Sequence, residues 1–236
     1  MTTAESLPRS WRFVRRRSMA LEAMDRPDLD PRLRNESLAG LGRLRRSFLR
    51  PEPLLGALLR RLPPGDGRTS RLVELGAGTG ELSAWIGRAL RHRGLRVEMV
   101  ATDRVGAPGV REFDCTASGG WMDADLHFSN LLLHHLTEDE IRRSLGRQVA
   151  HSRLGAVHLD IVRGPLLYYL TRLSLPLLGY PRINQSDALL SIQAAFTAPE
   201  MESLGSGFQG RAVVRRVLPF RQILSIPSEN PRSAGR

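Results

Sequence analysis

A short run with one acid and three glycines carries the clearest chemical signal in this sequence. Residues 71 to 80 read Arg-Leu-Val-Glu-Leu-Gly-Ala-Gly-Thr-Gly, so an apolar strand leads into a turn with Glu74 two residues before its first glycine. Glycines in the turn let the backbone bend sharply and let a ligand approach where a Cβ would collide. The apolar spacing of residues 82 to 90 predicts a following helix, whose free N–H groups favour an anionic or zwitterionic ligand.

Two better-known glycine motifs are excluded by spacing and residue type. The dinucleotide fingerprint needs a glycine where this chain has Glu81, and the phosphate-binding P-loop needs a lysine, which the chain lacks entirely. The pattern that remains resembles motif I of the class I S-adenosylmethionine-dependent methyltransferases. That resemblance assigns to the methionine part of the cofactor Glu74, Gly76, Ala77, Gly78 and Gly80. An ordinary tight turn between strand and helix is the alternative explanation.

Two further acids follow at positions where the rest of such a cofactor would bind. Residues 95 to 102 alternate as a second strand that ends at Asp103, about 20 residues past the glycine turn, where an acid meets ribose hydroxyls in such folds. The segment Phe113-Asp114-Cys115 resembles the third cofactor motif, which implies that Asp114 and Cys115 contact adenine. Only ten residues separate the two acids, too few for the usual helix. A helix cap or turn role for Asp103 and a surface turn for Asp114 remain alternatives.

A fourth segment combines an apolar strand with two histidines. Residues 125 to 136 read as a strand that reaches Asn130 and ends in His134-His135-Leu136, before Thr137 and Glu140 open a helix with capping-box spacing. A strand ending in this way resembles small-molecule methyltransferases related to ubiquinone and menaquinone methylases and to polyketide-tailoring enzymes. The resemblance implies that Asn130 lines the methionine end of the cofactor and that the histidine pair lies near the substrate.

The histidines suit the chemistry that this resemblance implies. Methyl transfer from a sulfonium is an in-line displacement, so most of the rate can come from holding the acceptor against the methyl group. A phenol has a pKa of about 10, and a neutral imidazole can remove its proton as attack proceeds. His134 and His135 are therefore the candidate catalytic residues, with packing or helix capping as the alternative. No Ser or Cys motif with a partner base indicates a covalent nucleophile.

Composition limits the partners and the compartment. The net charge is +11, but all 35 basic residues are arginine, which indicates a coding bias more than selection for phosphate contacts. The segment Arg15-Arg16-Arg17 beside Trp11 could rest on a membrane surface or be a solvated end. Six histidines and one cysteine show no metal-ligand spacing. The absence of an apolar signal core and of disulfide pairs predicts a soluble, cytoplasmic protein.

The order of these elements predicts an α/β fold: a Rossmann-like, doubly wound, mostly parallel sheet with a C-terminal antiparallel strand pair. We expect an N-terminal helical cap over residues 1–66, a catalytic domain over 67–228 and a disordered tail over 229–236. An apolar insertion over 165–196 follows the fifth strand and is predicted to be a substrate lid. Core filler and a homodimer surface are the alternatives for the insertion.

These features together predict methyl transfer from S-adenosylmethionine to a lipophilic phenol, quinone or polyketide, on oxygen in preference to carbon. Nucleic-acid methylation is the enzymatic alternative, which charge alone supports. Amino-methylating DNA enzymes carry a Pro-Pro-aromatic turn where this chain has Asn130-Leu131-Leu132-Leu133, so the motifs argue against it. A binding module that keeps the fold without catalysis is the other alternative, since the adenine segment is short.

Overall fold

The computed structural model describes residues 16–228 apart from 27, 48, 64–66 and 209–211. Of the segment predicted to contact a membrane, Trp11 and Arg15 lie outside the described residues, whereas Arg17 donates from Nε to the Ala194 carbonyl at 2.5 Å. The disorder predicted for the tail at 229–236 also lies outside the described residues. The chain divides into two compact units. We name them the helical unit (Met1–Arg50 and Ile161–Thr197) and the sheet unit (Pro51–Asp160 and Ala198–Arg236).

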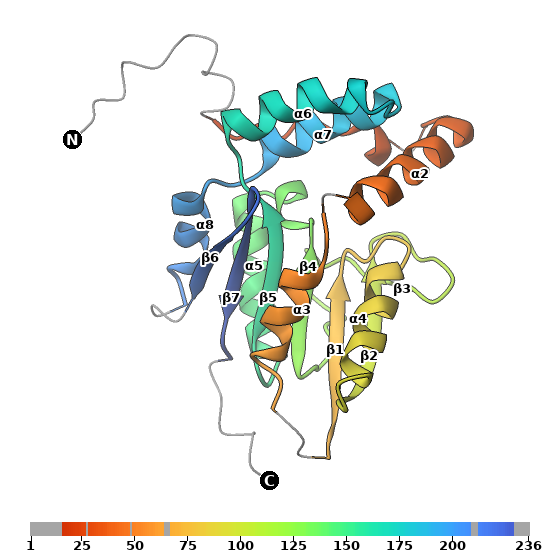
Figure 1. Ribbon diagram of the computed structural model, residues 1–236. Helices are drawn as coiled ribbons and strands as arrows, with labels where there is room; N and C mark the ends of the chain where they lie inside the picture. Colours follow the sequence, from red (N-terminus) through yellow and green to blue (C-terminus); the bar gives the residue numbers. More distant parts are fainter. Residues whose placement is uncertain (1–15, 27, 48, 64–66, 209–211, 229–236) are drawn as a thin grey trace, which may run out of the picture. The chain divides into compact units, whose positions relative to one another are not determined.

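The sheet unit is built on seven strands in the order β3-β2-β1-β4-β5-β7-β6 (Figure 1). Four pairs of neighbouring strands are parallel: β3 with β2, β2 with β1, β1 with β4, and β4 with β5. Strand β6 pairs antiparallel with β7. This confirms the predicted mostly parallel sheet with a C-terminal antiparallel pair. The strands are β1 (Thr69–Leu75), β2 (Arg96–Asp103), β3 (Arg111–Glu112), β4 (Leu126–Asn130), β5 (Ala156–Ile161), β6 (Val213–Val217) and β7 (Arg221–Ile226).

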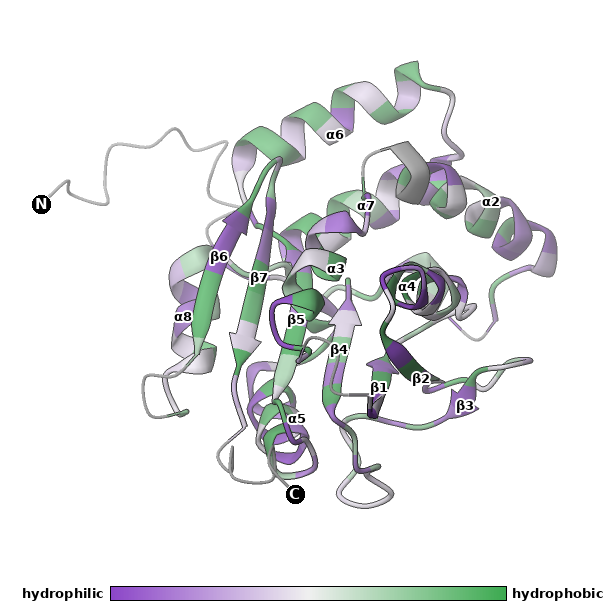
Figure 2. Ribbon diagram, turned by 60° about the horizontal axis from the view of Figure 1, so that its bottom comes forward, coloured by the Kyte–Doolittle hydropathy of each residue, from purple (hydrophilic) through white to green (hydrophobic). Residues whose placement is uncertain are grey.

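Buried apolar residues of the middle strands explain where the core lies, and Figure 2 shows hydrophobic stretches in β5 and β7. Alternate residues of β1, β4 and β5 pack on α3 (Glu52–Leu59) and α4 (Glu81–Arg91), as the buried cluster of Leu58, Leu72, Ile86 and Phe128 shows. Helices α5 (Glu138–Ala150) and α8 (Ala198–Gly205) complete the unit. Helix α3, which falls within the cap expected from the sequence, packs into this sheet core.

The helical unit joins segments far apart in the sequence. It contains η2 (Ala23–Asp25), α2 (Pro31–Ser47), α6 (Pro165–Leu177) and α7 (Arg182–Ala194). The Asn184 amide of α7 donates to the Ser37 carbonyl of α2 at 3.0 Å, and the Asp187 carboxylate accepts backbone N–H groups of Ala23 at 2.8 Å and Met24 at 3.1 Å. Buried polar residues of α7 therefore hold the N-terminal segment to the insertion.

Local sequence signals explain several element boundaries. Asp30 caps α2, because its carboxylate accepts the N–H groups of Arg32 at 2.7 Å and Leu33 at 3.4 Å. Thr137 and Glu140 form the predicted capping box at the start of α5. None of the helices that the structure describes combines the length and the hydropathy needed to cross a bilayer.

The prediction that the strand carries the two histidines at its end is wrong. Strand β4 ends at Asn130, Leu131 has a φ of 58°, and His134 and His135 lie in the short 3-10 helix η3 (Leu133–His135). The Leu131 N–H still donates to the Leu159 carbonyl at 2.9 Å, so pairing with β5 extends one residue beyond β4 before the chain turns away. An unbroken apolar run over 131–133 hid this turn in the sequence.

Candidate functional site

The glycine turn adopts the conformation that its sequence requires. Gly76, Gly78 and Gly80 have φ values of 67°, 57° and 74°, which residues with a side chain rarely adopt. A Cβ on Gly76 would also lie only 2.7 Å from Leu132 Cδ1, in the turn that follows β4. The turn therefore needs glycine for backbone geometry and for space, and it lies directly against the segment that leads to the histidines.

Asp103 lies beside this turn, as its position at the end of β2 predicts. Its Oδ2 accepts the Gly78 N–H at 2.8 Å and its Oδ1 accepts the Val105 N–H at 3.2 Å. The Ala77 N–H donates to the Thr102 carbonyl at 2.9 Å and ties the turn to β2. A carboxylate has about four acceptor positions, so these two contacts leave capacity for the two hydroxyls of a ribose. The site therefore fits a nucleoside cofactor.

Glu74 lies beneath the turn and is buried. Its Oε2 accepts a hydrogen bond from the Ser83 hydroxyl of α4 at 2.5 Å, and its backbone carbonyl accepts from the Thr102 hydroxyl at 2.6 Å. This acid therefore braces α4 and β2 against the end of β1. A contact between Glu74 and the cofactor remains a prediction.

The segment with Asp114 and Cys115 lies next to Asp103. The Phe113 N–H donates to the Asp103 carbonyl at 2.8 Å, and the exposed Asp114 carboxylate accepts from the N–H and hydroxyl of Thr116 at 2.8 and 2.7 Å. Cys115 is buried, and burial together with the charge of Asp114 raises the pKa of its thiol to about 11. A thiol in this state is a packing group and not a nucleophile. Adenine contacts of these two residues remain predictions.

The structure separates the two candidate histidines by their surroundings. His134 is buried: its Nδ1 lies 2.7 Å from Asp160 Oδ1, and its backbone N–H donates to Asp160 Oδ2 at 3.1 Å. His135 is exposed, with its ring centroid 4.3 Å from that of His134. Asp160 belongs to β5 and was missed in the sequence. An acid among the apolar residues of a buried strand was the signal that could have identified it.

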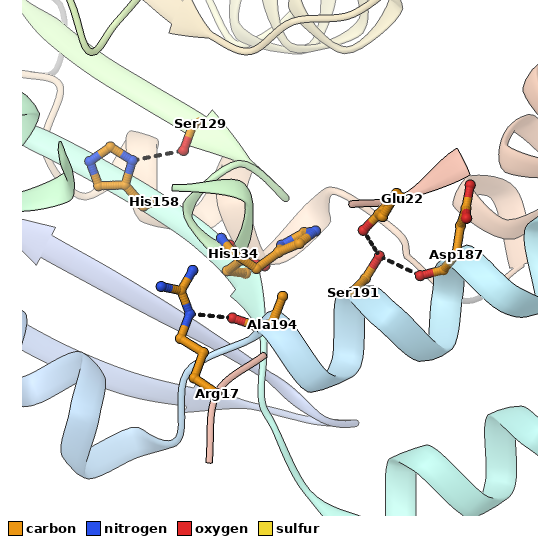
Figure 3. A network of polar contacts seen from close by, with 9 residues as sticks. Arg17, Glu22, Ser129, His134, His158, Asp187, Ser191 and Ala194 are labelled. Carbon is orange, nitrogen blue, oxygen red and sulfur yellow. Dashed lines mark hydrogen bonds and ion pairs between the residues drawn. The ribbon is translucent and has the colours of Figure 1, made fainter. Parts of the chain in front are cut away.

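A second buried polar pair lies on the same face of the sheet. The Ser129 hydroxyl of β4 lies 2.8 Å from His158 Nδ1 of β5, as Figure 3 shows. Burial lowers the pKa of His158 to about 3 and that of His127, on β4, to about 4. Both rings are therefore neutral at pH 7. Asn130 ends β4 half-buried at the same edge as the glycine turn, and its role in cofactor binding remains a prediction.

These buried polar groups follow one another along strands β4 and β5. His158 and Asp160 share one face of β5, because side chains two residues apart point the same way. Register pairs Ser129 with His158 across β4 and β5. At the end of this polar row, the Asp160 carboxylate holds the His134 ring. The arrangement can orient an imidazole and fix its tautomer, which is what a general base requires.

Comparisons with known proteins agree with this architecture. No family model and no curated protein matches the sequence. The plantazolicin methyltransferase BpumL in complex with SAH aligns with a TM-score of 0.61 and 12% identity, over 84% of this chain and 91% of that chain. The citrinin polyketide synthase CMeT domain aligns with a TM-score of 0.50 and 16% identity over 74% of this chain, which spans 50% of that chain.

The fold by itself does not select a cofactor. A putative zinc-dependent alcohol dehydrogenase from Rhodobacter sphaeroides also aligns, with a TM-score of 0.50 and 12% identity, over 80% of this chain and 96% of that chain. Glycine turns of dinucleotide-binding proteins have a spacing that this chain lacks, because Glu81 replaces their third glycine. The sheet order, the antiparallel end pair and the glycine turn together show that this chain has the class I methyltransferase fold.

Proposed function

We propose that this protein transfers a methyl group from S-adenosylmethionine to a lipophilic small molecule, on oxygen. One observation carries the proposal: the Asp103 carboxylate lies against the glycine turn and accepts the Gly78 N–H at 2.8 Å, with acceptor capacity left for a ribose. The SAH complex of a methyltransferase with the same fold supports the choice of cofactor. In open α/β sheets this edge, beyond the carboxyl ends of the strands, is where ligands bind.

Each predicted cofactor residue then has a defined task. When bound, S-adenosylmethionine supplies an electrophilic methyl group on a sulfonium. The turn from Gly76 to Gly80 would receive the methionine part, Asp103 would accept the ribose hydroxyl protons, and Asp114 with the Cys115 backbone would meet adenine. Asn130 would line the methionine end. The positive φ values of the glycines support this assignment, because they keep side chains away from the approach path.

His134 is the base that we propose for a phenolic acceptor. With Nδ1 donating to Asp160, the neutral ring has Nε2 as its proton acceptor. Asp160 also stabilises the imidazolium that forms when the proton arrives, and it acts through His134 as a positioning residue. We assign the proton transfer to His134 because the Asp160 carboxylate fixes its ring and its backbone N–H.

The acceptor is proposed to be lipophilic because of the insertion over 165–196. The insertion is rich in apolar residues, and it leaves the carboxyl end of β5, next in the chain to Asp160. The plantazolicin methyltransferase BamL has been solved with a triazolic desmethylPZN analog and SAH, and it aligns with a TM-score of 0.54 and 13% identity over 78% of this chain. A lid over the acceptor is the role that we propose for the insertion.

Thermal unfolding with S-adenosylhomocysteine tests the cofactor directly. Ligand at 100 times its dissociation constant adds about 2.7 kcal/mol, which should raise the midpoint of a chain this long by roughly 5 to 10 °C. We expect Asp103→Asn to weaken binding at least tenfold and to reduce the shift, because the amide cannot accept both hydroxyl protons. Glu112→Gln, exposed on neighbouring β3, is the matched control and should keep the shift.

The outcomes separate the proposed function from its alternatives. No midpoint shift in a folded parent protein would overturn the cofactor assignment and favour a binding module without catalysis. Cofactor binding with turnover only on RNA or DNA would overturn the small-molecule acceptor. Methylated product from a phenol panel, identified by mass spectrometry, would support transfer to oxygen.

A further inference from the structure

Helix α6 exposes an apolar stripe that folding of the helical unit leaves uncovered. Leu166, Leu170, Leu173 and Leu177 recur at spacings of four, three and four residues, which places them on one side of the helix. They are 61%, 46%, 65% and 78% exposed. Figure 2 shows how apolar residues continue along α6. An exposed stripe of this kind marks an interaction surface.

The stripe is not the packing face of the helix. Tyr168 and Leu175, which project from the opposite side, are buried with 8% and 4% exposure. One side of α6 therefore supplies the core of the helical unit, and the other side is free to meet an apolar environment. Leu178, at the end of the helix, is 50% exposed and extends the stripe to the turn between α6 and α7.

Exposed arginines lie on the α6–α7 hairpin and beside its turn, and the hairpin itself carries no exposed carboxylate. Arg172 is exposed on α6, and Arg182 is exposed at the start of α7. Arg43 is exposed at the turn between the two helices, where its guanidinium lies 4.6 Å from the Tyr180 ring centroid. The only acid over residues 161–197 is Asp187, which is buried and accepts two backbone N–H groups.

The charge of the whole helical unit has the same sign. Residues 1–50 and 161–197 contain 15 arginines and 7 acids, a net charge of +8 out of +11 for the chain. Leucines that insert at the level of lipid headgroups, with arginines around them, are the pattern of a helix that lies in an anionic membrane interface. We propose that the α6 stripe binds the surface of an anionic phospholipid bilayer, with Leu173, Leu177 and Leu178 inserted.

A second copy of the chain is the competing occupant, because spacings of four and three residues also suit a helix–helix seam. In a two-fold contact between hairpins, the arginines of one copy would approach those of the other, and the exposed acids of this unit (Asp28, Asp30 and Glu36) lie on or before α2 and outside the hairpin. An anionic headgroup layer neutralises them directly. The charge pattern therefore favours the membrane.

Flotation with vesicles tests this surface on the full chain without cofactor, so the result does not depend on methyl transfer. We expect binding to vesicles of phosphatidylcholine with 30% phosphatidylglycerol that weakens as salt rises, and little binding to phosphatidylcholine alone. Leu173→Gln with Leu177→Gln should lower the partition coefficient at least tenfold, since each substitution removes the free energy gained by burying a leucine side chain in the bilayer. The substitutions Arg43→Gln and Arg182→Gln should each lower the partition coefficient about fivefold.

Leu218→Gln is the matched control, because this leucine is 89% exposed but belongs to the sheet unit. It should bind vesicles like the parent protein. A fluorescent probe that reports polarity, placed on Leu177→Cys after Cys115→Ala, should shift its emission to the blue on anionic vesicles. The same probe on Leu218→Cys should not shift. Together these two labels separate insertion of α6 from binding through the arginines near the N-terminus.

Three results would overturn the proposal. Vesicle binding that Leu173→Gln with Leu177→Gln leaves unchanged would place the contact elsewhere. No binding to anionic vesicles by the folded parent protein at low salt would exclude the membrane as the occupant. A dimer in sedimentation velocity that the double variant dissociates, together with absent vesicle binding, would show that the stripe is a seam between two copies.

Discussion

The residue that distinguishes the two histidines is Asp160. Its two carboxylate oxygens receive the His134 ring and backbone, so the ring is held in one orientation at the edge of the sheet. Two adjacent histidines look equivalent in the sequence, and the structure distinguishes His134 by its burial and by its contact with the buried acid on β5. A fixed tautomer matters because a general base must present the correct nitrogen to its substrate.

At this scale we predict that Asp160→Asn lowers kcat for a phenolic acceptor about a hundredfold, within the usual range for general-base catalysis. The KM for S-adenosylmethionine should change little, because Asp160 contacts His134 and lies outside the proposed cofactor site. A more acidic phenol, already ionised at the assay pH, should lose much less activity. His135→Gln is the matched comparison and should retain most of the rate. An equal loss for both phenols would show that Asp160 is structural only.

At the scale of elements, the turn after β4 sets the positions of the histidines and of α5. Leu131 turns the chain out of the sheet, η3 carries the histidines, and the Thr137 capping box starts α5 two residues later. Glu140 Oε2 accepts from the Thr137 N–H at 2.8 Å and from its hydroxyl at 2.7 Å, and these bonds lower the pKa of the Glu140 carboxyl.

We predict that Thr137→Ala lowers the free energy of unfolding by about 0.5 to 2 kcal/mol, because the first turn of α5 loses its cap. Thr137→Ser keeps the hydroxyl and should stay much closer to the parent. Urea unfolding at pH 7 measures both variants, and the free energy of unfolding should depend on urea concentration with the same slope in each. A serine variant as unstable as the alanine variant would mean that the methyl group, and not the cap, stabilises this turn.

At the scale of the whole molecule, two buried histidines make the free energy of unfolding depend on pH. His127 and His158 have folded pKa values of about 4 and about 3, lowered mainly by burial, against about 6.5 in an unfolded chain. Below pH 6.5 the unfolded chain therefore takes up protons that the folded chain refuses. Stability contributed by these rings is complete above pH 6.5 and is lost progressively as the pH falls toward 3.

We predict that the free energy of unfolding falls between pH 7.5 and pH 5, by up to about 1.4 kcal/mol per pH unit for each histidine once its unfolded form is titrating. His127→Gln with His158→Gln should flatten this dependence, whereas His92→Gln, at an exposed position, should not. Urea titrations at the two pH values give the comparison. An unchanged slope in the double variant would assign the acid sensitivity to other groups.

The sequence by itself determined the parallel sheet, the glycine turn, the acid that ends β2 and the capping box of α5. These features follow from local rules: period-two hydrophobicity, positive φ at glycine, and hydrogen bonds between residues three apart. For the same reason the missing helix between Asp103 and Asp114 was predictable, because ten residues with two glycines and a proline leave no room for it.

Tertiary structure decided which distant residues meet. Asp160 reaches His134 only because β4 and β5 are neighbours in the sheet, and the left-handed turn at Leu131 is set by that pairing and not by an apolar run. Likewise, Asn184 and Asp187 are polar residues in a largely apolar insertion, and the structure buries both and uses them to hold N-terminal segments to α7. Long-range pairing and burial fix these contacts, and neither can be read from local spacing.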